Sequence, residues 1–210
     1  MPREHILHKV RTALGRRVGQ APATAPPAVL RIPEMDPEAR IARFFQEIQK
    51  LAGRTSRAGS PAEAGAQVEA LIAGRPAVAS NAAILRQCGI TALPSVRTDF
   101  NDAAELRAAC ALAEFGITSA DYALADTGTL VLLSSREQAR LISLLPPVHL
   151  AIVPQGKILT GLDELLAALP QPAGLSSSMV LITGPSRTAD IEQTLVRGVH
   201  GPGEIHVIVV

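Results

Sequence analysis

The segment GPSRTADIE, residues 184–192, carries residue types that bind small anions. Its Gly-Pro pair is typical of a turn, and Ser186 or Thr188 can cap a helix that follows the turn. The free backbone N–H groups of a first helical turn attract anions. Arg187 adds a planar guanidinium whose donors suit a carboxylate or a phosphate. The segment therefore predicts an anion clamp at the start of a helix.

A second interpretation of Arg187 needs no ligand. Acids are favoured at a helix N-terminus by about 0.3 to 1 kcal/mol, which suits Asp190 and Glu192 but not an arginine. Arg187 and Asp190 lie three residues apart, so they can form a local ion pair in solvent. The segment alone leaves both interpretations open. It is not a Walker loop, because the pattern G-x-x-x-x-G-K-[ST] is missing from the chain.

The segment ADTGT, residues 125–129, is a second candidate. Asp126 at a strand end could act as a carboxylate base or pair with Arg187, and Thr127 could donate a hydrogen bond. The alternative is a plain hairpin turn, in which Asp126 and Thr127 bond their own backbone and Gly128 supplies a positive φ. Spacing alone favours the turn.

His200 is the third candidate, within GVHGPGEIH ahead of a last apolar strand. An exposed imidazole there could act as an acid or base, although most single loop histidines have no such role. His149 and His206 alternate with apolar residues, so we interpret them as strand-end or partly satisfied residues. No spacing of ligands predicts a metal site, and the G-x-S-x-G pattern of serine hydrolases is missing.

The composition narrows the class of partner. Hydrophobic residues make up 47% of the 210 residues, aromatic residues only 2%, and the net charge is +1. A base-stacking surface needs aromatic rings, and attraction of phosphate backbones needs positive charge, so a small molecule or a protein is the expected partner. The two cysteines, Cys88 and Cys110, cannot hold an iron–sulfur cluster unaided. No apolar run reaches the roughly 18 residues of a membrane span, and we expect a cytoplasmic protein.

Hydrophobic periodicity alternates between helix and strand along most of the chain. This alternation predicts an α/β fold with a mostly parallel sheet and helices on both faces. A tight Asp-Thr-Gly link between two apolar runs predicts an antiparallel hairpin within it. The predicted helices lie at 37–52, 61–73, 81–88, 102–115, 137–143, 162–169 and 188–197, and the predicted strands at 76–80, 121–134, 148–153, 179–183 and 205–210. Ligands of such folds bind beyond the carboxyl ends of strands, where the 184–192 segment is expected to lie.

The chain divides into two parts. Residues 1–35 read as an N-terminal amphipathic helical arm and a proline-rich linker. Residues 36–210 read as one α/β domain, which begins where Asp36 can cap a helix and Pro37 can occupy its first turn.

Four motifs in one order resemble a known family. ADTGT, LLPPVHLAIVP, GPSRTADIE and GVHGPGEIHVIVV together are similar to the lactate-utilization protein C family of the LUD-domain group, densely over about the last hundred residues. The resemblance implies a fold like that of the NagB/RpiA/CoA-transferase group. It also implies that the family's signature positions form the site: Thr127, Gly128, Gly184, Pro185, Ser186, Arg187, Thr188, Asp190, Glu192, His200 and Gly201.

The same resemblance implies a function. Bacterial proteins of this family act with two iron–sulfur partner proteins that carry the clusters, and together they oxidise L-lactate to pyruvate. In that role the chain is expected to bind a small carboxylate or an organic cofactor between the loops of Asp126, Arg187 and His200. In an enzymatic form of the role, His200 or Asp126 would take the hydroxyl proton or the α-proton of lactate. The family commonly has Glu where this chain has Asp126, which disfavours a covalent acyl carrier of the coenzyme A-transferase kind. A non-catalytic assembly or regulatory subunit, and a stand-alone sugar-phosphate isomerase or coenzyme A-transferase-like enzyme, remain as alternatives.

Overall fold

The computed structural model describes residues 3–17, 19–20, 33, 35–169, 176–191 and 194–210, with side chains left out at 188–197. The N-terminal helix α1 (Arg3–Ala13) has no buried residue. The proline-rich linker predicted after it falls mostly outside the described residues. No described helix has both the length and the apolar character that crossing a membrane requires.

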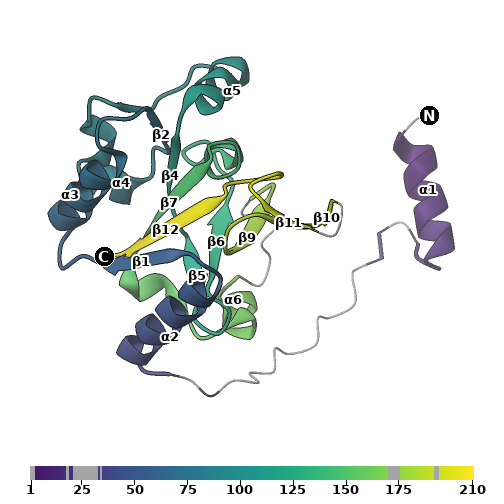
Figure 1. Cartoon of the computed structure of the whole chain (residues 1–210). Coiled ribbons are helices and arrows are strands. Elements are labelled where there is room, and N and C mark those ends of the chain that lie inside the picture. The colour runs from purple at the N-terminus through teal and green to yellow at the C-terminus, as the bar shows by residue number, and fades with distance from the viewer. Residues whose placement is uncertain (1–2, 18, 21–32, 34, 170–175, 192–193) are drawn as a thin grey trace.

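A six-stranded sheet forms the centre of the domain, and all of its neighbouring strands run parallel (Figure 1). The α/β fold with a mostly parallel sheet is thus confirmed. In spatial order its strands are β1 (Arg54–Arg57), β12 (Glu204–Val209), β7 (Val148–Val153), β4 (Phe115–Ser119), β2 (Ala77–Ala79) and β3 (Val96–Arg97).

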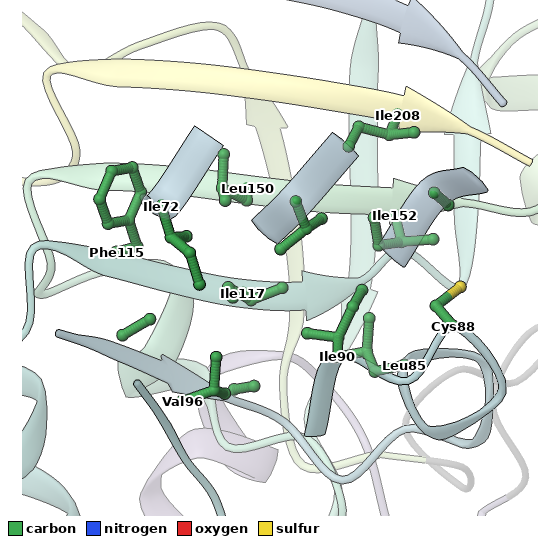
Figure 2. Close-up of a cluster of buried hydrophobic side chains, with 14 of the residues drawn as sticks. Ile72, Leu85, Cys88, Ile90, Val96, Phe115, Ile117, Leu150, Ile152 and Ile208 are labelled. Atoms are coloured by element: carbon green, nitrogen blue, oxygen red, sulfur yellow. The ribbon is translucent and has the colours of Figure 1, made fainter. Parts of the chain in front are cut away.

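One face of this sheet is covered by the helices α3 (Pro61–Ile72) and α4 (Ala83–Gln87), followed by a short 3-10 turn (Ile90–Ala92). Figure 2 shows the core that results, in which Ile72 and Leu85 of the helices meet Leu150 and other strand residues. Successive side chains of a strand point to opposite faces, so alternate residues of each strand supply this core. Leu, Ile, Val and Ala make up most of it, and Phe115 is its aromatic residue.

The opposite face is covered by helix α2 (Pro37–Lys50) and by a second sheet. The second sheet has the order β8 (Ile158–Leu159), β5 (Tyr122–Leu124), β6 (Thr129–Leu133) and β9 (Met179–Thr183). β5 and β6 are antiparallel, which confirms the predicted hairpin. Helix α6 (Leu162–Ala168) buries Leu165 against the outer face of this sheet.

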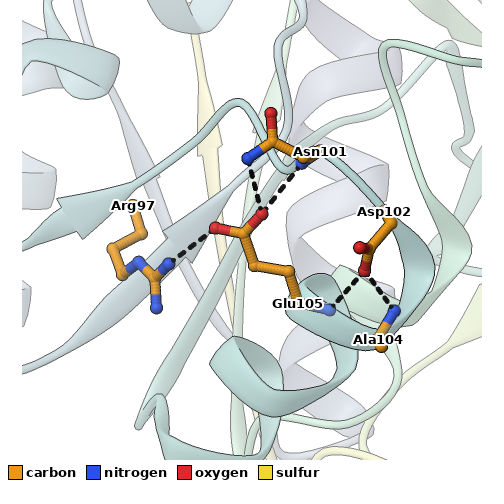
Figure 3. A network of polar contacts seen from close by, with 5 residues as sticks. All are labelled: Arg97, Asn101, Asp102, Ala104 and Glu105. Atoms are coloured by element: carbon orange, nitrogen blue, oxygen red, sulfur yellow. Dashed lines mark hydrogen bonds and ion pairs between the residues drawn. The ribbon is translucent and has the colours of Figure 1, made fainter.

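Two of the helices begin at capping carboxylates. Asp36 accepts a hydrogen bond from Ala39 N at 2.9 Å, and a proline occupies the first turn of α2, as predicted. In Figure 3, Asp102 accepts from two backbone N–H groups at the start of α5 (Ala103–Leu112). Glu105 joins the same cluster by accepting from Asn101 and from Arg97. These hydrogen bonds lower the pKa of Glu105.

The helix predicted at 188–197 is wrong. The chain there forms two antiparallel strands, β10 (Arg187–Ile191) and β11 (Thr194–Arg197). Thr, Ile and Val recur in this segment, and their branched side chains favour strands over helices. The anion site therefore has no helix N-terminus at this segment.

Two further predicted helices have different bounds. The helix predicted at 102–115 ends at Leu112, and Phe115 already belongs to β4, a central strand that the sequence pattern did not separate from the helix. The element predicted at 137–143 is a short 3-10 helix, η2 (Arg140–Ser143).

Candidate functional site

A cavity of about 330 Å³ lies where three distant segments meet. These segments are strand β9 with the turn that follows it, the 3-10 helix η2, and the loop before β12. The cavity is lined by Arg140, Ser143, Leu144, Val180, Leu181, Ile182, Thr183, Gly184, Pro185, Ser186, Arg187, His200, Gly201, Pro202 and Ile205.

Backbone hydrogen bonds join the two loops of the cavity. Ser186 N donates to Pro202 O at 2.8 Å, and Gly198 N donates to Ser186 O at 3.1 Å. Gly203 N donates to Pro147 O at 2.9 Å, which ties the same loop to the start of β7. The segments that line the cavity are therefore held together by hydrogen bonds of the main chain.

Glycine allows η2 to approach the main sheet. A Cβ on Gly116, in β4, would lie only 1.9 Å from the carbonyl oxygen of Ile142 and 3.0 Å from Cγ of Pro146. The backbone of η2 thus rests directly on the strand, which places Ser143 and Leu144 at the cavity.

Arg187 makes a contact that neither sequence interpretation foresaw. Its Nη2 donates a hydrogen bond to the backbone carbonyl of Leu51, the residue that ends α2. The last carbonyls of a helix carry partial negative charge, so a guanidinium is favourable there. Gly184 lies at the same place, with φ of 82° and its α-carbon packed toward the Leu51 side chain. The contact links the turn after β9 to the end of α2.

The cavity is electropositive. Arg140 and Arg187 both line it and are exposed, and His200 adds an exposed imidazole. None of the described residues that line it is an Asp or a Glu. Among the described residues, no side chain pairs with the guanidinium of Arg140, which leaves its donors available to an anion.

The structure brings together six of the residues predicted from the sequence, and these line the cavity: Gly184, Pro185, Ser186, Arg187, His200 and Gly201. Thr188 and Asp190 lie on β10, where only the backbone is described, so the predicted pairing of Arg187 with Asp190 falls outside the described side chains. Glu192 lies outside the described residues altogether.

Asp126, Thr127 and Gly128 form the turn between β5 and β6 and are not among the described residues that line the cavity. Asp126 N donates to Thr160 O at 3.0 Å, and the Asp126 carboxylate lies beside Gly161. Gly128 has φ of 65°, as the turn requires. The Asp126–Arg187 pairing considered from the sequence is not among the contacts of the described residues.

Sequence reasoning missed Arg140, Ser143 and Thr183. Arg140 and Ser143 belong to a 3-10 turn with no motif, and Ser143 is buried, with its hydroxyl donating to Arg140 O at 3.0 Å. Thr183 ends a strand that was predicted, so its position at the strand end was the one available signal.

The location of the cavity differs from the expectation for a parallel sheet. Its loops precede β7 and β12, so it lies at the amino ends of these two strands. Strand β9, in the second sheet, presents its carboxyl end there. The second sheet, through its strand β9, therefore contributes a wall of this site beside the main sheet.

The remaining candidate groups lie in the core. His149 is fully buried, and burial lowers its pKa to about 4. Burial and Arg54 also lower the pKa of His206, against the opposing effect of Glu204. Cys88 and Cys110 are buried, and burial raises the pKa of both thiols, that of Cys110 to about 11. Within the described part of the chain, no three His, Cys, Asp or Glu residues are grouped as metal ligands.

The fold and this cavity define an α/β protein with an electropositive hollow beside its second sheet. The model of the LUD domain family matches residues 41–210, and the chain belongs to that family.

Two curated relatives illustrate the likeness. Over 102 residues the chain is 44% identical to the lactate utilization protein C of Halalkalibacterium halodurans and 41% identical to that of Bacillus subtilis strain 168. Each match covers 47% of this chain and 44% or 42% of the relative, so under half of either relative is spanned.

A solved structure shows the same fold. It is a DUF162 family protein from Deinococcus radiodurans, with a TM-score of 0.63 and 21% sequence identity. The match covers 84% of this chain and 99% of that one.

Proposed function

We propose that this chain takes part in lactate utilization and that it binds a small organic carboxylate in the cavity beside β9. Membership of the LUD domain family and the names of the similar proteins support the first part. The charge of the cavity supports the second part.

One observation carries the binding proposal. Two arginines line the cavity, and none of the described lining residues is acidic. Like charges at the wall of a hollow reinforce one another, because the low-dielectric protein focuses their field into the cavity. A monocarboxylate would gain charge-assisted hydrogen bonds there.

The residues that line the cavity have different roles in this proposal. Arg140 is the principal anion ligand, because one N–H of Arg187 is already engaged by the Leu51 carbonyl. His200 presents an imidazole at the cavity, where it can take up a proton from the ligand. Oxidation of lactate to pyruvate releases two electrons and two protons. In this proposal His200 takes up one proton, the second passes to water, and the electrons pass to iron–sulfur clusters held by two partner proteins.

A second candidate function is that of an assembly subunit without chemistry of its own. Exposed apolar side chains at or next to the cavity favour it: Leu144, Leu145, Leu181 and Val199 are 39% to 43% exposed. Exposed apolar residues that gather in one area often mark a protein interface.

Calorimetric titration of the purified chain with L-lactate, pyruvate, phosphate and coenzyme A tests the binding proposal. We expect the monocarboxylates to bind, and Arg140→Gln to weaken them about 10-fold to 100-fold, as the loss of a charged hydrogen bond implies. Arg107→Gln is the matched control, since Arg107 is exposed on α5 and does not line the cavity.

Equal weakening by Arg140→Gln and Arg107→Gln would reduce the effect to net charge and reject the cavity. If no small molecule binds while the chain copurifies with iron–sulfur proteins, the assembly function replaces the carboxylate proposal.

A further inference from the structure

A chain of hydrogen-bonded side chains runs from the β5–β6 turn to the cavity. Thr127 Oγ1 donates to Asp126 Oδ1 at 3.1 Å. The hydroxyl oxygens of Thr127 and Thr129 are 2.8 Å apart, and those of Thr129 and Thr183 are also 2.8 Å apart. Thr183 lines the cavity. The ADTGT turn, which does not itself line the cavity, is therefore connected to it through two strands.

The carboxylate at one end sets the direction of every bond in the chain. An ionised carboxylate only accepts hydrogen bonds, whereas a hydroxyl has a single proton to give. A hydroxyl bond to a charged oxygen is roughly twice as strong as one to a neutral oxygen, so Thr127 gives its proton to Asp126. Thr127 can then only accept from Thr129.

Because Thr129 is buried, the direction of its hydrogen bond to Thr127 also fixes the direction of its hydrogen bond with Thr183. Thr129 is 3% exposed and both of its neighbours in the chain are hydroxyls, so it has no water with which to exchange partners. Since Thr129 donates its hydrogen bond to Thr127, it must accept one from Thr183. The proton of Thr183 is thereby directed away from the cavity, and the remaining lone pairs of its oxygen are the ones left for a ligand.

We propose that the Asp126–Thr127–Thr129–Thr183 chain makes Thr183 a hydrogen-bond acceptor at the cavity and so selects 2-hydroxy acids over 2-keto acids. This inference rests on the proposed binding of a carboxylate. The arginines bind the carboxylate, and Thr183 Oγ1 accepts a hydrogen bond from the adjacent hydroxyl of the ligand. A ketone oxygen in the same position meets only lone pairs. A protonated amine would also donate, but it is disfavoured beside two guanidinium groups.

The test compares the dissociation constants of L-lactate and pyruvate, which differ at the 2-position, in wild type, Thr129→Val and Thr129→Ser. We expect wild type to prefer L-lactate by about tenfold, the value of one hydrogen bond with its partner left unpaired in the ketone. Thr129→Val breaks the chain at its buried link while Thr127 and Thr183 can turn to water, so the preference should fall to about one. Thr129→Ser keeps the hydroxyl and should keep the preference.

Asp126→Asn provides a second variant at an only partly buried turn, in case Thr129→Val does not fold. An amide can donate as well as accept, so the direction is no longer set and the preference should again fall. Affinity for pyruvate should change little in either variant, because the arginines are intact.

The outcomes separate the two proposals. Equal binding of both acids by wild type, or a preference that survives both Thr129→Val and Asp126→Asn, would overturn the directed chain and leave carboxylate binding standing. Failure of both acids to bind to wild type would overturn the two together.

Discussion

Both sheets bury polar side chains, and the two sheets differ in where the hydrogen bonds of these side chains lead. In the main sheet, His149 and Thr118 are fully buried, with 2.8 Å between His149 Nε2 and Thr118 Oγ1. His149 Nδ1 has no hydrogen-bond partner among the described residues. In the second sheet, Thr129 is buried as well, but its two hydrogen bonds continue to exposed residues on either side.

The difference teaches that burial of a polar group does not by itself indicate a site. The His149 pair is fully buried and neither residue lines the cavity, so we expect it to act on the stability of the fold. The hydroxyl chain of Thr129 ends at the cavity, where the direction of its hydrogen bonds can affect the binding of a ligand. A polar group without a partner in the core costs about 1 to 3 kcal/mol, so a buried pair of this kind should show itself in stability measurements.

The stability of the protein should be more sensitive to added volume in the main sheet, beside His149, than at the cavity. Gly116 is the register partner of His149 in the neighbouring strand, and a Cβ there would meet the Ile142 carbonyl oxygen at 1.9 Å. We expect Gly116→Ala to lower the free energy of unfolding by about 3 kcal/mol or more, because backbone must move to make room. Urea denaturation measures the loss.

Gly201→Ala is the matched control on the cavity side. Its Cβ would lie 3.5 Å from Cβ of Ser186, an ordinary contact, and its expected effect is below about 0.5 kcal/mol. Similar losses of unfolding free energy in the two variants would contradict the expectation that the main sheet tolerates added volume less than the cavity does.

The buried His149 pair should also make stability depend on pH. Burial lowers the pKa of His149 from 6.5 to about 4, so the folded protein keeps the imidazole neutral where the unfolded chain protonates it. The unfolded state binds more protons between these values, and the free energy of unfolding therefore falls as the pH falls through this window. From about pH 7.5 to about pH 4.5 the loss should be about 2 to 3 kcal/mol.

His149→Gln should remove most of this pH dependence, since glutamine can still bond Thr118 but does not titrate in this range. His206→Gln is the control, because His206 is less deeply buried and Glu204 opposes the lowering of its pKa. A pH profile that His149→Gln leaves unchanged would assign the loss to other groups.

Capping and turn residues correctly predicted the elements that depend on short stretches of sequence. Asp36 and Pro37 start α2, and the Asp-Thr-Gly link with its positive φ at Gly128 forms the hairpin turn. The prediction of a helix at 188–197 was wrong because it rested on capping residues alone. The pairing of β10 with β11 is not visible from such local signals. Strand β4 was missed because it follows α5 almost without a break.

The site was predictable only in part, for a physical reason. The motif residues from Gly184 to Arg187 and from His200 to Gly201 meet in the cavity. Arg140 reaches it only because η2 rests on Gly116, a contact between positions far apart in the sequence. The hydroxyl chain likewise depends on the register that sets Thr129 opposite Thr183, which no spacing along the chain specifies.

Substitution of Arg187 should have the smallest effect on stability. It tests the comparison directly, because Arg187 both contacts the end of α2 and lines the cavity. Its hydrogen bond to the Leu51 carbonyl is exposed, so Arg187→Gln should lower the free energy of unfolding by about 1 kcal/mol or less. The affinity for a monocarboxylate should fall by less than in Arg140→Gln, since part of the guanidinium serves the end of α2. Denaturation and calorimetric titration of the same samples measure both effects, with Arg187→Lys as the variant that keeps the charge. If Arg187→Gln abolished binding and left stability unchanged, Arg187 would be a dedicated anion clamp, and its bond to Leu51 would contribute nothing to holding the turn.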